Sequence, residues 1–257
     1  KRLDDAHYYL AMISDEENDP EQAIEHYLKV NSGNNYLISL RNYTELMIGH
    51  DRYSEASEYL QQLRLRRPDI NSTLLALEGS LLLDAEEYYS AFTFLSRAIN
   101  NNSNDTRLIQ LRTIVSQELD DFVLLELDLR SLMRLEPNNP SPFNTLGYYL
   151  TDQTNRFSEA KDLIDRAVEL SPNDPAITDS LGWVQFKLGM YEEAKINLER
   201  AFELFPDHEV AAHLGEVLWV MGKREAAREI WENALKNRPE SDFILNTMQR
   251  LDAEPDN

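Results

Sequence analysis

Cysteine is absent from the 257 residues, which excludes disulfides, thiolate metal sites and cysteine nucleophiles within this span. Glycine and proline are scarce, with 8 and 10 residues, so the sequence has few of the turn signals that a strand-rich fold requires. No apolar run approaches the roughly 20 residues that a transmembrane helix needs. Leucine, glutamate, alanine and arginine fill long stretches instead, and we therefore predict an all-α fold.

Basic residues are also in short supply, because 25 Lys and Arg stand against 46 Asp and Glu, a formal net charge of −21. Such a surface repels phosphate backbones and anionic lipid headgroups, and no compact basic stripe offsets it. Nucleic acid and membrane surfaces are therefore not expected partners. A cationic or apolar protein surface is compatible with this charge, although the same acidity also serves solubility alone.

The motifs of catalysis are missing as well. Neighbouring carboxylates such as Glu192 and Glu193 point about 100° apart on a helix, so they do not converge as an acid and a base. No glycine-rich loop is available to hold a phosphate. The five histidines have no metal-ligand spacing and no adjacent nucleophile motif: His7, His26, His50, His208 and His213. We predict no enzyme activity, no metal and no cofactor.

A repeated helical pattern occupies the chain. In residues 179–206 two blocks of apolar residues at helical spacing are separated by Gly189 and followed by Pro206, which predicts two helices joined by a tight turn. The residue in the first small position of each second helix recurs every 33 to 35 positions, at Ala23, Ala56, Ala91, Leu125, Ala160, Ala194 and Ala227. We predict seven units, at approximately 4–36, 37–71, 72–105, 106–139, 140–174, 175–207 and 208–240.

The sixth unit shows the signature of the repeat most clearly, with Leu181, Gly182, Ala194 and Pro206 at the positions of a 34-residue helix-turn-helix repeat. On these residues the chain resembles the tetratricopeptide repeat family. The resemblance implies one right-handed superhelical solenoid over residues 1–257, with an extended concave face lined by the first helix of each unit.

Gly182 has a structural explanation in such a fold. A glycine inside a helix costs roughly 1 kcal/mol relative to alanine, so we expect it to face Ala194 and let the two helices approach closely. The resemblance assigns the same kind of role to a set of small residues: Gly79, Ala91, Gly147, Ala160, Gly182, Ala194, Ala201, Gly215, Ala227 and Ala234.

The concave face is where the resemblance places partner-binding residues. Its candidates in the last three units are Asn144, Tyr148, Asp179, Trp183, Phe186, Lys187, Glu216 and Trp219. Aromatic side chains bury large areas with few rotors to freeze, although they also pack between repeats, and both roles stay open. Acidic inner positions such as Asp152 suit a basic partner segment. The basic residues with which some family members clamp a terminal carboxylate are scattered here, which disfavours that mode.

Residues 140–239 show a further similarity, in stretches such as SLGWVQFKLG and AAHLGEVLWVMGK, to the C-terminal repeats of bacterial tetratricopeptide lipoproteins. This resemblance implies a Gram-negative periplasm, an outer-membrane lipid anchor upstream and an adaptor role for a C-terminal-processing protease or its substrates. Because the chain begins with Lys1 rather than methionine, we expect a piece of a longer protein.

Three hypotheses follow for function. The first is a non-enzymatic adaptor that binds a protein or peptide on its concave face and acts through proximity. The second is the substrate-recognition region of a larger enzyme, and the third is self-association through uncapped repeat ends. At the C-terminal end we expect a capping helix over 241–252, with a disordered tail after it. The side chains expected to turn inward from this helix are Phe243, Ile244, Leu245 and Met248 or Leu251.

Overall fold

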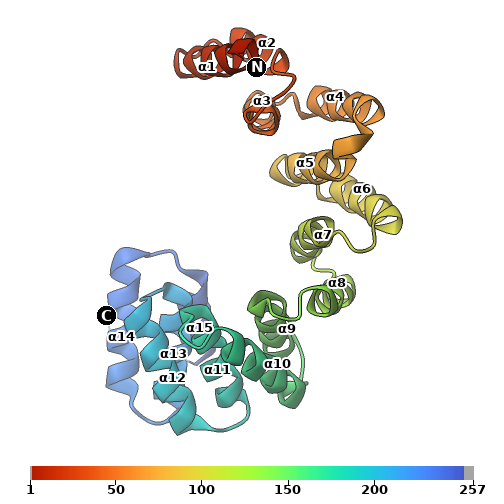
Figure 1. Cartoon of the computed structure of the whole chain (residues 1–257). Helices are drawn as coiled ribbons and strands as arrows, with labels where there is room; N and C mark the ends of the chain where they lie inside the picture. The colour runs from red at the N-terminus through yellow and green to blue at the C-terminus, as the bar shows by residue number, and fades with distance from the viewer. Residues whose placement is uncertain (1, 252–257) are drawn as a thin grey trace. The chain divides into compact units, whose positions relative to one another are not determined.

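Residues 2–251 are described by a computed structural model, and within them the chain forms 15 α-helices, one short 3-10 helix and no strand (Figure 1). The helices follow one another as hairpins joined by short loops, which confirms the predicted helix-turn-helix repeat solenoid. The chain divides into two compact units, Lys1–Ser131 and Leu132–Asn257, with the boundary inside one helix.

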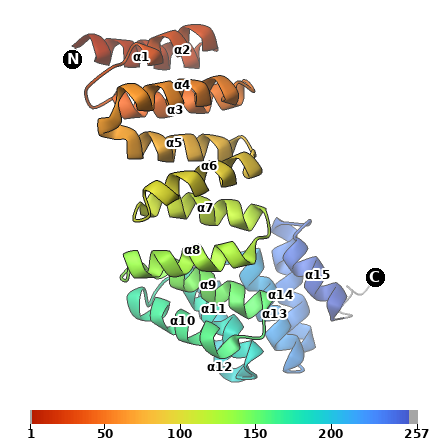
Figure 2. The ribbon, with the colours of Figure 1, turned by 90° about the vertical axis from the view of Figure 1, so that its right-hand side faces the viewer.

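The first unit contains four helix pairs that lie in successive layers in chain order (Figure 2). A 3-10 turn, η1 (Pro68–Ile70), precedes the third pair. The helices are α1 (Arg2–Glu16), α2 (Pro20–Leu28), α3 (Tyr36–Gly49), α4 (Tyr53–Arg66), α5 (Asn71–Asp84), α6 (Tyr88–Asn101), α7 (Thr106–Glu118) and α8 (Phe122–Leu135), the last of which crosses the boundary.

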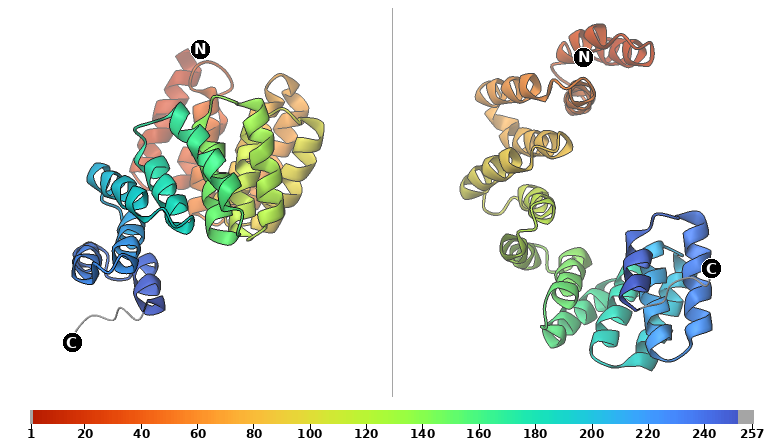
Figure 3. Two further views of the ribbon diagram at one scale, coloured as in Figure 1. Left: turned by 90° about the horizontal axis from the view of Figure 1, so that it is seen from below. Right: turned by 180° about the vertical axis from the view of Figure 1, so that it is seen from behind.

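The second unit contains three pairs and one additional helix, which Figure 3 shows in green to blue from two further sides. They are α9 (Pro140–Gln153), α10 (Phe157–Leu170), α11 (Pro175–Lys187), α12 (Tyr191–Leu204), α13 (His208–Val220), α14 (Arg224–Asn237) and α15 (Asp242–Arg250). The residue bounds of each pair agree closely with those of one predicted repeat unit. A single domain over residues 1–257 stays a prediction.

Small residues close the hairpins of the second unit, as expected. A Cβ added to Gly182 would lie 2.6 Å from Leu198 Cγ and 3.1 Å from the carbonyl oxygen of Ala194. Equivalent contacts would form at Gly147 against Ile164 and at Gly215 against Trp231. The lost helix propensity is offset by burial of these large side chains, at about 25 cal/mol per Å² of apolar area.

The fourth repeat closes its hairpin with charge instead. Arg112 of α7 donates from Nε and Nη2 to the Asp128 carboxylate of α8, at 2.8 and 2.7 Å, and from Nη1 to Ser96 Oγ at 3.0 Å. Both charged side chains are largely buried. A buried pair of this kind is satisfied only when both partners are present.

Helix α15 covers the end of the last repeat and contacts α13. Ile244 and Met248 are buried, in agreement with the predicted inward face. Leu245 is 43% exposed, so the prediction that it turns inward is wrong; it lies about 100° around the helix from Ile244. Phe243 is 45% exposed, but one edge of its ring contacts His208 of α13, with centroids 5.2 Å apart. The predicted disordered tail lies outside the described residues.

Candidate partner-binding site

The first helices of the second unit start at well-defined positions. Asn139, Asp174 and Asp207 accept hydrogen bonds from backbone N–H groups two residues later, and so cap α9, α11 and α13. Helices that start at equal intervals bring equivalent positions of neighbouring repeats side by side. Side chains about 34 residues apart therefore meet on the face that these helices share.

A pocket of about 350 Å³ opens on this face. Its walls come from four helices, α9, α11, α13 and α15. The lining residues are Tyr148, Asp152, Trp183, Ala212, His213, Glu216, Asp242, Phe243, Asn246, Thr247 and Arg250. The pocket thus combines aromatic walls with several carboxylates.

A buried pair of His213 and Asp179 supports the inner wall. His213 Nδ1 lies 3.0 and 3.1 Å from the two carboxylate oxygens of Asp179, one repeat away. The His213 ring stacks on Trp183, with centroids 4.1 Å apart and an interplanar angle of 17°. Burial alone would lower the pKa of His213, but the Asp179 carboxylate outweighs it and the pKa is raised.

A second hydrogen bond ties α9 to α13. The Tyr148 hydroxyl donates to Glu209 Oε1 at 2.5 Å, although the two residues are 61 positions apart. Burial, together with the neighbouring Glu209 carboxylate, raises the pKa of Tyr148 above its usual range. The tyrosine therefore stays protonated and holds the rim of the pocket.

The far side of the pocket is closed by an ion pair. Arg250 of α15 donates from Nη1 and Nη2 to the two carboxylate oxygens of Glu216, at 2.8 and 2.5 Å. The Glu216 side chain is 4% exposed, whereas that of Arg250 is 54% exposed. The carboxylate is thus fixed in the wall, and the guanidinium reaches it from the surface.

The structure brings only part of the predicted site together. Tyr148, Trp183 and Glu216 line the pocket, and Asp179 lies behind it as the partner of His213. Phe186 stacks on Trp183 at 5.2 Å, and Lys187 Nζ lies 4.3 Å from the centroid of the same indole.

Five of the eight predicted residues do not line this pocket, and two of these, Trp219 and Asn144, also have no hydrogen bond or ring contact with its walls in the described part of the chain. Trp219 packs on Trp231, with centroids 5.9 Å apart, and beneath the guanidinium groups of Arg224 and Arg228. Asn144 does not line the pocket, and its buried Oδ1 has no hydrogen-bond partner among the described residues. A partner-binding role for either residue stays a prediction.

His213 and Arg250 are site residues that sequence reasoning missed. The histidines match no metal or nucleophile motif, so the sequence does not predict His213 as a site residue, and Arg250 falls only within the predicted capping helix. The spacing holds a usable signal, because Asp179 and His213 are 34 positions apart, as are Glu216 and Arg250. Complementary charges separated by one repeat length predict such pairs.

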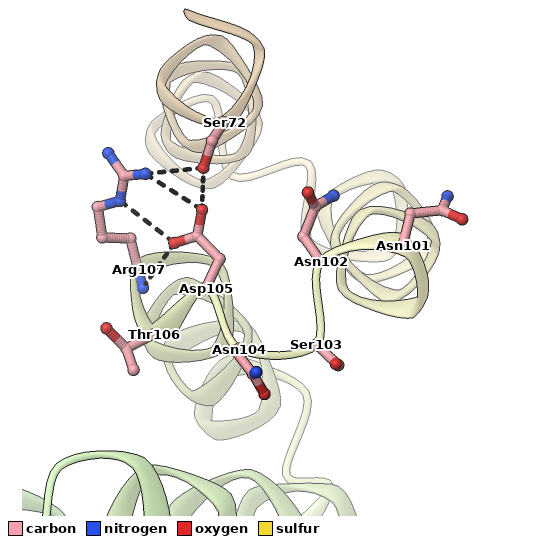
Figure 4. Close-up of a pocket in the computed structure, with 8 residues that line it drawn as sticks. All are labelled: Ser72, Asn101, Asn102, Ser103, Asn104, Asp105, Thr106 and Arg107. Carbon is pink, nitrogen blue, oxygen red and sulfur yellow. Dashed lines mark hydrogen bonds and ion pairs between the residues drawn. The ribbon is translucent and has the colours of Figure 1, made fainter.

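A second pocket, of about 610 Å³, lies in the first unit at the loop between α6 and α7 (Figure 4). Asp105 caps α7, accepts from Ser72 Oγ, and accepts from Arg107 Nε and Nη2 at 3.2 and 3.1 Å. The charged groups drawn there satisfy one another, as the dashed lines in Figure 4 indicate. We interpret this cluster as a joint between helices α5 and α7.

Other kinds of site are not found in the described part of the chain. No group of three or more His, Asp or Glu side chains in residues 2–251 is arranged to hold a metal ion. None of the helices in the same range combines the length and apolar composition that a bilayer crossing requires.

Residues 180–208 match the family described as "Tetratricopeptide repeat", and they coincide with most of α11 and α12. Within these residues the chain carries a tetratricopeptide repeat. The TPR repeat-containing protein PA4667 of Pseudomonas aeruginosa is 35% identical over 214 residues, which cover 83% of this chain and 36% of that protein. The chain thus spans about a third of the length of this curated relative.

Solved tetratricopeptide-repeat structures share the fold at low identity. A protein from Parabacteroides merdae aligns over 98% of this chain and 99% of its own, with a TM-score of 0.64 and 13% identity. A thermophilic protein from Thermus thermophilus covers 71% of this chain and 97% of its own, with a TM-score of 0.56 and 20% identity. YrrB, described as having an unusual peptide-binding site, covers 75% and 99%, with a TM-score of 0.57 and 20% identity.

Proposed function

We propose that this chain is a non-enzymatic scaffold that binds a protein partner on the face formed by α9, α11 and α13. The observation behind the proposal is the pocket in which aromatic and acidic side chains from these successive first helices meet. Aromatic side chains offer a partner large contact area at low entropic cost, and tetratricopeptide repeats are protein-interaction folds.

The charge of the pocket favours a basic partner segment. Asp152, Glu216 and Asp242 line it, with Arg250 as the opposing guanidinium, and His213 is already paired with Asp179. The net charge of −21 on the chain extends this bias beyond the pocket. Electrostatic attraction of this kind raises association rates and selects against acidic partners.

A more specific role follows from the resemblance to bacterial tetratricopeptide lipoproteins. In that role the chain belongs to a periplasmic, outer-membrane-anchored adaptor and holds a C-terminal-processing protease or its substrates. The Pseudomonas aeruginosa relative supports a bacterial source, and the peptide-binding site in the description of YrrB supports peptide binding by this fold. The anchor and the protease rest on the resemblance alone. A scaffold that holds two proteins together raises their effective concentration without a catalytic group of its own.

Site-specific photocrosslinking in source cells tests both levels of the proposal. A benzophenone amino acid is placed at Asp152, in the pocket, and at Glu192, which is exposed on the outer helix α12 as a matched control. We expect partner crosslinks at Asp152 that are missing at Glu192, with the protease or its substrates among them.

With the crosslinker kept at Asp152, the charge reversal Asp242→Lys at another pocket carboxylate is then expected to reduce those crosslinks, and Glu192→Lys serves as the control. A reproducible partner other than the protease or its substrates at Asp152 would retain the scaffold and reject the adaptor. Equal crosslinking at both positions, or none at Asp152, would reject the pocket as the binding site.

A further inference from the structure

One carboxylate in the pocket is already bound by a guanidinium group. Glu216 is buried in the wall and receives two parallel hydrogen bonds from the guanidinium of Arg250. Two N–H donors facing two carboxylate oxygens is the geometry that distinguishes arginine from lysine. The site is therefore shaped for a planar guanidinium.

The Arg250 guanidinium contacts Glu216 on one side and is open to solvent on the other. More than half of the Arg250 side chain is exposed, so it returns to water without losing much packing. Asp152 and Asp242, two further carboxylates of the lining, are exposed. The pocket thus has more negative charge than Arg250 neutralises.

The aromatic wall contains a donor without an acceptor. Trp183 lines the pocket and is 4% exposed, and its Nε1–H has no hydrogen-bond partner in the described part of the chain. A buried donor left unsatisfied is energetically unfavourable. Because Trp183 lines the pocket, its indole N–H signal reports on a segment that enters it.

We infer that this pocket receives one arginine side chain of a partner segment, which replaces Arg250 on the Glu216 carboxylate. The inference rests on the proposed function, because the arginine belongs to the protein bound on the α9, α11 and α13 face. Arg250 then acts as an internal competitor that keeps Glu216 paired while the pocket is empty.

Exchange of one guanidinium for another avoids the main cost of opening a buried ion pair. Removing a partner from such a pair is strongly unfavourable because a buried charge remains unpaired, whereas replacement in kind leaves the carboxylate satisfied throughout. The pocket volume of about 350 Å³ lies at the lower end of the roughly 300–1,000 Å³ typical of ligand sites. An arginine side chain suits this size.

The test uses the whole chain and the probe peptide acetyl-Gly-Arg-Gly-amide, followed by NMR of the three tryptophan indole N–H signals. The Trp183 signal is assigned with Trp183→Phe. We expect the probe to shift this signal. Its affinity for Arg250→Gln is expected to be at least about tenfold higher than its affinity for the wild type. The lysine and citrulline versions of the probe are expected to bind at least roughly tenfold more weakly than the arginine version.

Two further variants keep the test decisive if Arg250→Gln folds poorly. Arg250→Lys retains a positive charge near Glu216 but loses the paired donors, and it is expected to bind the probe more tightly than the wild type. Glu216→Gln/Arg250→Gln removes both charges, and it is expected to lose probe binding while its spectrum stays dispersed.

Equal affinity of the arginine probe for wild type and both single variants would overturn the inference. So would equal binding of the arginine and lysine probes, or a shift confined to Trp219. If these results came with partner crosslinks at Asp152, the proposed function would stand and the arginine site would fail. If neither the probe-induced shift of the Trp183 signal nor partner crosslinks at Asp152 were observed, the proposed function itself would be rejected.

Discussion

The two units build the same hairpin with different residues. In the second unit, Gly147, Gly182 and Gly215 let large side chains of the following helix approach the backbone. The first unit has one such glycine, Gly79, and joins neighbouring helices with the buried ion pair of Arg112 and Asp128 and with that of Arg64 and Glu78. Close approach and charge pairing are thus alternative ways to hold one helix against the next.

The turns inside the hairpins differ in the same sense. Six of them contain a residue with positive φ, between 53° and 79°, followed by a residue whose N–H bonds to a carbonyl five positions earlier. In the second unit this residue is glycine, at positions 189 and 222. In the first unit it is Asn18, Asp51, Glu86 or Asp120, so the same backbone is adopted at a steric cost.

Repeat geometry is therefore set by the backbone pattern and not by one residue type. The second unit meets the pattern with glycine, which adopts positive φ and close contact without strain. The first unit meets it with polar residues, whose contributions depend on their partners.

The largest expected effect is the loss of the buried ion pair in the first unit. Arg112→Ala leaves Asp128 buried and unpaired, and we expect it to lower the free energy of unfolding by roughly 3–5 kcal/mol. Urea unfolding followed by far-UV circular dichroism measures this loss. The double variant Arg112→Met/Asp128→Leu is expected to recover most of it, and equal losses in the single and double variants would contradict the argument.

Overpacking of the glycine contact in the second unit comes next. Gly182→Leu places a side chain where even a Cβ would lie 2.6 Å from Leu198, and we expect a loss of roughly 1–3 kcal/mol. All three tryptophans lie in the second unit, so fluorescence-detected unfolding reports on it directly. Gly49→Leu is the control, because a Cβ there meets nothing within 4 Å. It lies in the first unit, so far-UV circular dichroism follows both variants, and an equal loss in the two would refute the contact.

A reciprocal pair of turn substitutions has a smaller expected effect. Gly189→Ala forces a side chain onto a φ of 79° and is expected to cost about 1–2 kcal/mol. Glu86→Gly relieves the same strain in the first unit and is expected to stabilise the chain by less than about 1 kcal/mol, since glycine also loses more backbone entropy. Melting temperatures that moved in the same direction would show that the turns are not equivalent.

The most gradual effect is a pH dependence confined to the second unit. Because the pKa of His213 is raised in the folded chain, its stabilisation is complete below the ordinary imidazole value and fades as pH rises through the raised value. We expect the fluorescence-detected urea midpoint to fall across that window. Asp179→Asn removes the carboxylate responsible and is expected to flatten the slope, and an unchanged slope would exclude His213 as its source.

The sequence predicts the repeat well because its period, its small residues and its turn glycines are local signals. Gly182 and Ala194 could be paired from the repeat pattern alone, and the structure confirms the contact. Arg112 could only be recognised as a departure from the pattern. Its pairing with Asp128 requires the folded hairpin, which places residues 16 positions apart in contact.

The candidate site could be predicted only in outline. Three of the eight predicted residues, Tyr148, Trp183 and Glu216, line the pocket, because first-helix positions define the shared face. Burial and partners could not be predicted, since they depend on which neighbour each side chain reaches. Asp179 and Glu216 are each buried and paired with a residue one repeat away, His213 and Arg250, and a partner-binding role for either stays a prediction.

The hydrogen bond between Tyr148 and Glu209 has a consequence for how the second unit opens. In a stack of repeats each unit normally senses only its immediate neighbours, and the ends fray independently. This bond skips the sixth repeat and couples the fifth directly to the seventh. The last three repeats should therefore exchange their amide hydrogens as one cooperative block, so that the pocket they form is either present whole or lost whole.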